Sequence, residues 1–280
     1  MTAPAMSFGT DNGRYYRHPG HHKTVPSITN IKNVKGVEAI KYAAVRDAAT
    51  YAVDNYDRLH GLNRDEAITL IKKAPFARSD DSPSAIGDVV HDWIDVWVKD
   101  GCPDLADYVP YGMLKATPQA PDGYKQAPIT ARRMWGQFIE FVRYYTAKAG
   151  LRFIDSEFTV WSDTYGYAGT ADLAMVLNDE YVLADTKTGK AAYPDTAMQL
   201  APLAKADYII TPDGEAKTLY PFTKFAILHL RPMSYQLIPV YNIDEAFKAF
   251  LGLKAEFDWD VQYSDRTLGY APKFGSQEKR

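Results

Sequence analysis

The pattern of apolar and polar positions divides the chain into a helical first half and a strand-rich second half. The clearest helical pattern is a set of apolar residues spaced three or four apart, as on one face of an α-helix: Ile86, Val89, Val90, Trp93, Ile94 and Trp97. Polar residues, among them His91, occupy the other face. A further helix is expected from Thr130 to Ala149, because Gly150 follows it and glycine commonly ends helices.

The chain before this stripe predicts a flexible segment followed by helices. Residues 1–27 are rich in Gly, Pro, His and Tyr and show no regular period, so we expect either a solvated loop or a loop that contacts DNA. Ser27 is a capping residue that begins a mainly helical stretch to about Ile71. Asn63 predicts the start of its last piece, since Glu66 follows it at the capping-box spacing.

After Gly150 the period changes to two, which is typical of strands. The expected strands cover residues 152–161, 165–177, 181–187, 224–230 and 235–240. A helix capped by Asp195 is expected to run to about Tyr208 with a kink at Pro202, and another to run from Asp244 to about Phe257. Two stretches, residues 75–83 and 101–128, read as loops because they are polar or rich in proline.

This order of elements predicts an α/β fold with a central mixed β-sheet flanked by helices and a helical N-terminal region. We expect a single domain over residues 28–260, of which 28–150 are mainly helical and 151–260 form the sheet core. The flexible residues 1–27 precede it, and a polar tail, 261–280, follows.

Composition narrows the class of protein. Apolar residues make up 46% and charged residues 24%, as in ordinary globular proteins, and the net charge is −3. Cys102 is the only cysteine, which excludes an internal disulfide and any multi-thiolate metal site. No apolar run approaches the roughly 20 residues of a membrane span, and the first residues do not resemble a signal peptide. We therefore expect a cytoplasmic protein without a membrane partner.

The residues with the clearest chemical meaning lie on two consecutive strands. Asp172 and Asp185 can meet across a short hairpin, and Lys187 shares a strand face with Asp185. Carboxylates are hard ligands for Mg²⁺ or Mn²⁺. Such a metal makes bound water nucleophilic near neutral pH, and a lysine can orient or deprotonate that water. Taken alone, these residues are also compatible with a cross-strand salt bridge on an exposed sheet edge.

Several blocks together resemble the PD-(D/E)XK nuclease superfamily, in particular its RecB-like branch of phage-encoded and CRISPR-associated exonucleases. Residues 185–190, DTKTGK, resemble the D-x-K-T-G signature, and residues 169–173, GTADL, resemble the G-x-x-D-hydrophobic block. Residues 86–91, IGDVVH, are similar to the helix that carries a histidine ligand, and Gln199 opens a segment similar to the Q-x-x-x-Y motif. Residues 25–29, VPSIT, resemble the opening of phage members.

The resemblance implies a restriction-endonuclease-like core that hydrolyses DNA phosphodiester bonds with Mg²⁺ or Mn²⁺. It implies a metal held by the side chains of His91, Asp172 and Asp185 and by the main-chain carbonyl of Thr186. Lys187 would be the catalytic lysine, with Gln199 and Glu157 completing the candidate catalytic set. For Glu157, a second-metal or supporting role and a plain surface pair remain alternatives.

The resemblance also implies partners and a setting. DNA, as linear ends or single strands, would be the substrate, and a phage recombinase or annealing protein is a candidate partner in the host cytoplasm. Candidate DNA contacts are Arg132, Arg133 and Lys190, although a solvated helix face explains the two arginines equally well.

The chain departs from the family pattern at two points. Leu203 stands where the motif that Gln199 opens expects a tyrosine, and the cysteines of an iron–sulfur cluster are missing, which excludes such a cluster. The sequence leaves three functions open: an exonuclease, a structure-specific or nicking endonuclease, and a catalytically silent DNA-binding scaffold on the same fold. It does not predict an oligomeric state.

Overall fold

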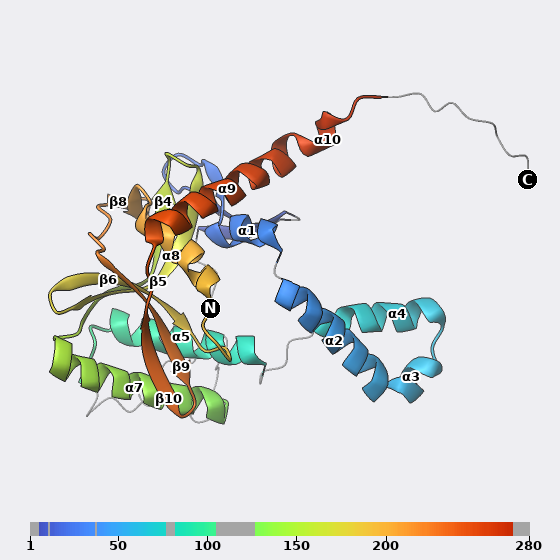
Figure 1. The fold of residues 1–280 in the computed structure, drawn as a ribbon, viewed down its shortest axis with the longest axis horizontal. Coiled ribbons are helices and arrows are strands. Elements are labelled where there is room, and N and C mark those ends of the chain that lie inside the picture. The colour runs from blue at the N-terminus through green and yellow to red at the C-terminus, as the bar shows by residue number, and fades with distance from the viewer. Residues whose placement is uncertain (1–5, 11, 37, 77–81, 105–126, 271–280) are drawn as a thin grey trace, which may run out of the picture.

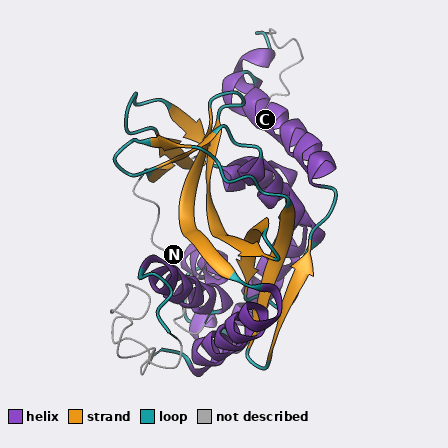
Figure 2. Ribbon diagram, turned by 90° about the vertical axis from the view of Figure 1, so that its left-hand side faces the viewer, coloured by secondary structure: helices purple, strands orange, loops and turns teal. Residues whose placement is uncertain are grey.

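The computed structural model describes residues 6–10, 12–36, 38–76, 82–104 and 127–270. A seven-stranded mixed sheet forms the centre, and helices cover both of its faces (Figures 1 and 2). The expected α/β class with a mixed sheet and N-terminal helices is therefore confirmed. Among the described residues, no helix is both long and apolar enough to cross a bilayer.

The sheet has the strand order β10-β9-β6-β5-β4-β7-β8. Its strands are β4 (Arg152–Ser162), β5 (Tyr167–Leu177), β6 (Glu180–Lys187), β7 (Tyr208–Ile210), β8 (Ala216–Lys217), β9 (Lys224–Arg231) and β10 (Ser234–Pro239). Only β6 and β9 run parallel; the other neighbours are antiparallel. Asn178 and Asp179 make the tight turn between β5 and β6 with φ angles of 49° and 63°, as hairpin turns of two residues require.

Helices α5 (Pro83–Lys99) and α7 (Ile129–Ala149) cover one face. The predicted apolar stripe of α5 is buried there, with Trp93 against Trp135 and Trp97 against Phe138 at edge-to-face angles. The side chain of Ser82 caps α5 by accepting from the backbone nitrogen of Ala85. Both helices confirm the expectation from periodicity.

Helices α1 (Ile28–Lys32), α8 (Ala197–Ala204) and α9 (Ile243–Gln262) cover the other face. The expected end of α8 at Tyr208 was wrong: the helix ends at Ala204, because Tyr208 begins β7 and pairs with Trp161 of β4. Asp195 does not cap α8 but lies in a 3-10 turn before it, Pro194–Thr196.

The last helix also differs from expectation. Asn242, not Asp244, precedes α9, and the helix continues past Phe257 to Gln262. A short helix, α10 (Ser264–Thr267), follows within the expected polar tail, and residues 271–280 of that tail lie outside the described residues.

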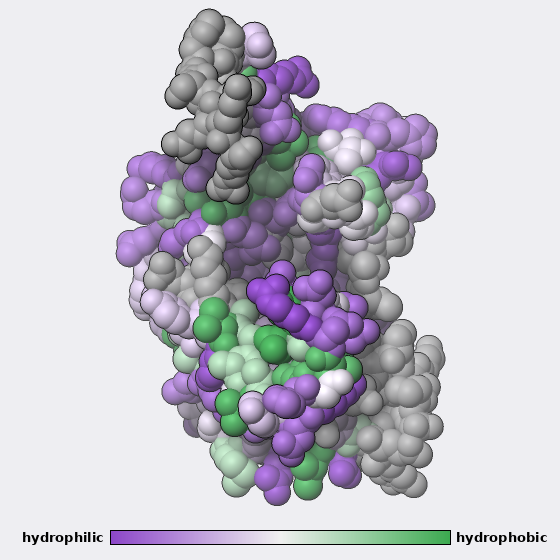
Figure 3. Space-filling model, turned by 90° about the vertical axis from the view of Figure 1, so that its right-hand side faces the viewer, coloured by the Kyte–Doolittle hydropathy of each residue, from purple (hydrophilic) through white to green (hydrophobic). Residues whose placement is uncertain are grey.

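The mainly helical stretch after Ser27 consists of separate helices. After α1 come a 3-10 turn (Asn33–Lys35), α2 (Glu38–Asp54), α3 (Tyr56–His60), α4 (Arg64–Lys73) and a second 3-10 turn (Ala74–Phe76). Ser27 caps α1 and Asn63 caps α4 through side-chain oxygens, as predicted. Helices α2–α4 pack against one another (Figure 1), and α2 exposes the apolar side chains of Val45 and Val53. Figure 3 shows apolar residues gathered on one face of the molecule.

The expectation of a flexible N-terminal segment was wrong. Three strands, β1 (Ser7–Thr10), β2 (Gly13–Arg17) and β3 (Thr24–Pro26), form an antiparallel sheet, whereas residues 1–5 and 11 of the predicted segment lie outside the described residues. Its Tyr16 and Val25 are buried in a small core with Trp161 of β4. These strands are short, and their apolar residues pack against residues more than 130 positions away in the sequence. No local periodicity therefore predicts the strands.

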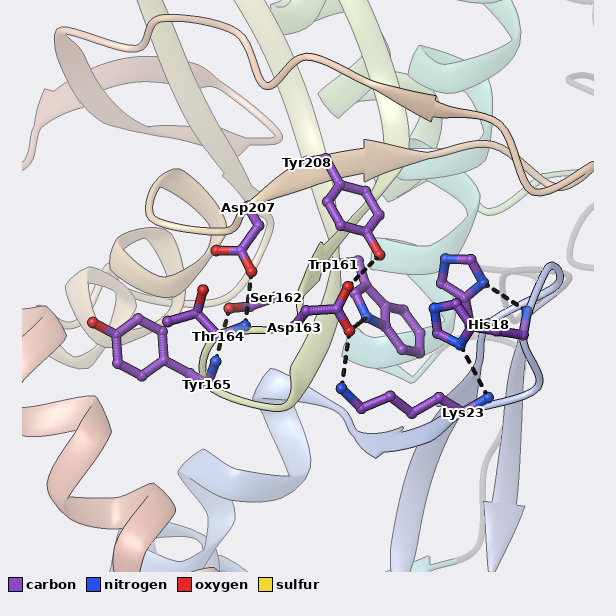
Figure 4. A network of polar contacts seen from close by, with 10 residues as sticks. His18, Lys23, Trp161, Ser162, Asp163, Thr164, Tyr165, Asp207 and Tyr208 are labelled. Atoms are coloured by element: carbon purple, nitrogen blue, oxygen red, sulfur yellow. Dashed lines mark hydrogen bonds and ion pairs between the residues drawn. The ribbon is translucent and has the colours of Figure 1, made fainter.

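A polar network attaches this N-terminal sheet to the large one (Figure 4). Asp163, in the turn after β4, accepts from Lys23 at 2.9 Å, from the Tyr208 hydroxyl at 2.9 Å and from the Trp161 indole at 3.2 Å. The Lys23 ammonium is the main reason why the pKa of Asp163 falls to about 2. His18, which is buried, meets the Trp161 ring edge-on.

Candidate functional site

The candidate site lies where two paired strands separate. Strands β5 and β6 pair from Leu177 and Glu180 as far as Leu173 and Ala184, and their ladder ends there. The next residues toward the site are Asp172 and Asp185, so both carboxylates stand at the opening. Beyond it, β5 continues with β4 and β6 continues with β9.

The main chain of Thr186 is bonded by side chains of the site. Its nitrogen donates to Asp172 Oδ2 at 2.8 Å, and its carbonyl oxygen lies 3.0 Å from His91 Nε2. A buried backbone group that loses its ladder partner must find another. The two residues that do this for Thr186, His91 and Asp172, are both predicted metal ligands, and the Thr186 carbonyl is another.

Three side chains converge beside this point. Ligand atoms of His91, Glu157 and Asp172 all lie within 4.8 Å of one another. The Nδ1 atom of His91 is 3.6 Å from a carboxylate oxygen of Glu157 and 3.6 Å from one of Asp172. The structure thus brings Glu157 into the group, which favours the site role over the surface-pair alternative.

Glu157 has a backbone conformation that is unusual for a strand. Its φ angle is +45°, in the left-handed region that non-glycine residues avoid. Ser156, on one side of it, donates to Asp95 of α5, whereas Phe158, on the other, lies in the core against α8 and α9. Strand alternation would place both on one face, so the left-handed residue switches the faces. Strained residues of this kind concentrate at functional sites.

Helix α5 delivers His91 to the opening. Val90 and Ile94 are buried in the core, which leaves His91 on the side toward β5 and β6. Gly87 permits the close approach, since a Cβ atom there would lie only 2.8 Å from Thr188 Oγ1. The small residue in the IGDVVH block therefore has a packing reason.

Asp185 and Lys187 form a separate pair next to this group. Lys187 Nζ lies 2.7 Å from Asp185 Oδ2, and the Asp185 side chain is only 2% exposed. The other carboxylate oxygen, Oδ1, is buried with no hydrogen-bond partner among the described residues. Such an atom normally has a partner, and a cation would provide one.

Burial and proximity shift the titration of these groups strongly. Burial opposes the charged form of His91, but the carboxylates of Asp172 and Glu157 outweigh it and raise the pKa of His91 to about 9. Burial, reinforced by Asp172, raises the pKa of Asp185 to about 6. Burial likewise raises the pKa of Asp172. Buried acids resist ionisation because their charges lack compensation, and a divalent cation would supply that compensation.

The donor set fits Mg²⁺ or Mn²⁺. It offers carboxylate oxygens, a main-chain carbonyl and one imidazole, of which the oxygens are the ligands these ions prefer and imidazole suits Mn²⁺ less strongly than the later transition metals. His91, Glu157, Asp172 and Thr186 also line one small, tight pocket. Cys102 is the only cysteine, so no thiolate cluster competes.

The site is bordered by a second ion pair, which the sequence did not predict. Asp195, before α8, lies 3.0 Å from Lys32 of α1. Burial opposes the charged form of Lys187, but Asp185 above all, together with Asp172 and Asp195, raises the pKa of Lys187 above its usual value. Gln199 is half-buried in the first turns of α8, which packs on β6. Leu203, in place of the expected tyrosine, is buried in the core.

The candidate DNA contacts lie outside this group. Arg132 is half-buried and Arg133 exposed near the start of α7, and Lys190 is exposed just after β6. The backbone before Lys190 is fixed by Arg231, which donates to the carbonyls of Thr188 and Gly189 at 3.0 and 2.7 Å. Lys190 is therefore an exposed residue on a loop whose backbone is held in place next to it.

Comparison with known proteins adds no relative. Neither a scan against protein-family models nor a search of curated proteins finds a match for this chain. The case for its function therefore rests on the site itself.

Proposed function

We propose that this protein is a Mg²⁺- or Mn²⁺-dependent deoxyribonuclease of the PD-(D/E)XK type, acting as an exonuclease on DNA. The observation that carries the proposal is the opening between β5 and β6, where Asp172 and the Thr186 carbonyl lie next to the Asp185–Lys187 pair. The motifs that resemble this superfamily predict the same residues, and His91 reaches them from a helix far away in sequence.

The chain's own residues would divide the chemistry as follows. His91, Asp172, Asp185, Glu157 and the Thr186 carbonyl offer ligands to the cation. When bound, the cation lowers the pKa of a water molecule and offsets charge on the phosphate. The Lys187 ammonium, held 2.7 Å from Asp185, would position that water and stabilise the developing negative charge.

Burial of the group explains why a cation is needed. Asp172 and Asp185 both resist ionisation in this environment, and their pKa values are raised. Without a cation the site is a poor base and an unfavourable place for a phosphate. Binding a divalent ion would ionise the carboxylates and turn the opening into an anion-accepting pocket.

The test is degradation of end-labelled linear DNA and of closed circular DNA, with Mn²⁺ or with EDTA. Wild type is expected to degrade linear DNA only, and only with Mn²⁺. The variants Asp185→Asn and Lys187→Ala should each lower the rate about a hundredfold or more, since the first removes a proposed cation ligand and the second removes the ammonium that would position the water.

Matched controls come from the far end of β6 and from the start of the adjacent strand β9. Glu180 of β6 and Lys224 of β9 form an exposed ion pair at 3.4 Å, so Glu180→Gln and Lys224→Ala remove the same charges without touching the site. Both should keep wild-type activity. Cleavage of circular DNA would instead identify an endonuclease. DNA binding without any cleavage would identify a scaffold, and activity surviving in Asp185→Asn would overturn the proposed site.

A further inference from the structure

The N-terminal sheet forms a second wall beside the candidate site. The hydroxyl of Tyr16, on β2, lies 2.9 Å from Thr170 Oγ1, on β5. Thr170 precedes Asp172 by two residues on the same strand, a spacing of about 7 Å. Tyr16 is 1% exposed, so this contact fixes the middle of β2 against the strand that carries the site.

Two further contacts hold the same wall in place. The backbone nitrogen of Ser27 donates to the carbonyl of Arg14 at 3.0 Å, and Ser27 itself bridges to Ala168 of β5. At the other end of the sheet, Lys23 is paired with Asp163 (Figure 4). The strand β2 is therefore attached to the large sheet on both sides of Tyr16.

Arg14 has an orientation that calls for an explanation. By the two-residue period of a strand, Arg14 and Tyr16 point to the same side of β2, and Tyr16 is buried against β5. Arg14 nevertheless remains exposed. Arg14 is therefore open to solvent on the side of β2 that faces β5.

The neighbourhood of Arg14 is that of the candidate site. Burial raises the pKa of Tyr16, the bond to Thr170 and the nearby charge of Arg14 oppose the rise, and Glu157 adds to it. The Tyr16 hydroxyl therefore lies within electrostatic range of both the guanidinium and the Glu157 carboxylate. Among the described residues, no carboxylate forms an ion pair with Arg14.

We propose that Arg14 binds a backbone phosphate of the DNA strand that enters the site, next to the phosphate under attack. This inference rests on the proposed function, because it assigns a polyanionic substrate to the same cleft. Arg14 is then a substrate-binding residue on the same side of β2 as Tyr16, and the N-terminal sheet is part of the substrate-binding surface. A guanidinium suits this task because it donates two parallel hydrogen bonds to phosphate.

The experiment measures binding of a fluorescent single-stranded oligonucleotide in Ca²⁺, over a range of salt concentrations. Each phosphate contact adds about 0.7 to the slope of log affinity against log salt for single strands. Arg14→Ala is expected to weaken binding roughly tenfold and to lower that slope by about 0.7. Arg14→Lys should keep most of the slope, and Tyr16→Phe should weaken binding less than Arg14→Ala.

Arg17 is the matched control. It is an exposed arginine on the same strand, but it points to the opposite face and lies 5.4 Å above the ring of Phe8. Arg17→Ala should leave the salt slope unchanged. Unfolding temperature and Mn²⁺ affinity, measured on each variant, show that the fold and the metal ligands are intact.

The outcomes separate this inference from the proposed function. A wild-type protein that binds and degrades DNA, with an unchanged salt slope in Arg14→Ala, would overturn the role of Arg14 alone. Equal losses in Arg14→Ala and Arg17→Ala would also overturn it, because they would show general charge attraction. A wild-type protein that neither binds nor degrades DNA would reject the function and the inference together.

Discussion

The backbone nitrogen of Thr186 donates to the carboxylate of Asp172 across 2.8 Å, where a sheet would ordinarily place a strand-to-strand hydrogen bond. The paired strands β5 and β6 have just separated at this point. A side chain therefore takes the place of a ladder partner, and the candidate site is built into the topology of the sheet rather than added on a loop.

At Glu157, the cost of the left-handed backbone and the contribution of the carboxylate to metal binding can be measured separately. We expect Glu157→Gly to raise the free energy of unfolding by about 1 kcal/mol, because glycine adopts a φ of +45° without the cost that other residues bear. The same variant should weaken Mn²⁺ binding, since the carboxylate is lost. Chemical denaturation and metal titration measure the two effects.

Glu157→Gln is the control for this prediction. It keeps a side chain in the left-handed conformation and removes only the charge. It should weaken Mn²⁺ binding as much as Glu157→Gly does and should gain no stability from backbone relief. Equal stability of the two variants would show that the backbone at Glu157 is not strained.

The metal-free protein should lose stability as the pH rises. The folded pKa of Asp185 is raised to about 6, above its unfolded value of 3.8, so its contribution is lost between these values. The folded pKa of His91 is raised to about 9, above 6.5, so its contribution is full below pH 6.5 and lost as the pH rises through 9. In EDTA, each group contributes at most about 3 kcal/mol.

Thermal unfolding at several pH values, with EDTA and with Mn²⁺, checks this expectation. The unfolding temperature in EDTA should fall from pH 5 to pH 9, and the upper part of that fall should vanish in His91→Gln. Added Mn²⁺ should remove most of the dependence, because a cation replaces the proton as the partner of the carboxylates. A metal-free protein that becomes more stable toward pH 9 would contradict the assigned shifts.

Gly87 should resist even the smallest substitution. Gly87→Ala puts a Cβ atom 2.8 Å from Thr188 Oγ1, and the helix must shift to accommodate it. We expect a loss of about 1–2 kcal/mol in stability, despite the better helix propensity of alanine, and weaker Mn²⁺ binding through displacement of His91. Denaturant unfolding and metal titration measure both.

Gly136, inside α7, is the matched position. A Cβ atom there meets nothing within 4 Å, so Gly136→Ala should gain about 0.5–1 kcal/mol from helix propensity. Thr188→Ala should restore much of the stability of Gly87→Ala. If both glycine variants were stabilised alike, the close approach of α5 to Thr188 would not constrain the fold.

The attachment of the N-terminal sheet should depend on Asp163. In Asp163→Ala, the amides of residues 13–26 are expected to exchange with deuterium faster, while the global unfolding temperature changes little, because exposed ion pairs contribute little to stability. Lys248→Ala removes an exposed pair with Glu245 on α9 and should leave this exchange unchanged. Unaltered exchange in Asp163→Ala would place the attachment elsewhere.

Much of the fold could be predicted because its signals are local. The stripe of α5 and the hairpin of β5 and β6 follow from periods that a few residues reveal. The same hairpin brings Asp172 and Asp185 to the point where the two strands separate, so the position of these two carboxylates was predictable as well.

The remaining features depend on contacts between distant residues. Tyr16 is buried because Thr170 and Trp161 lie against it, and nothing near Tyr16 in sequence indicates this. The end of α8 is decided by the pairing of Tyr208 with Trp161. The left-handed backbone of Glu157 could not be predicted, because the residue type and its neighbours do not distinguish it from a glutamate with ordinary strand geometry.

The position of the small N-terminal sheet has a consequence for the order of synthesis. Its strands leave the ribosome first, but the surfaces against which they dock belong to β4, β5 and β7, the last of which ends at Ile210. At about 5–20 residues per second, the sheet waits on the order of ten seconds or more for its binding surface. The cleft wall that carries Arg14 is thus completed only after the strands of the candidate site have been made, so an unfinished chain would lack a complete cleft.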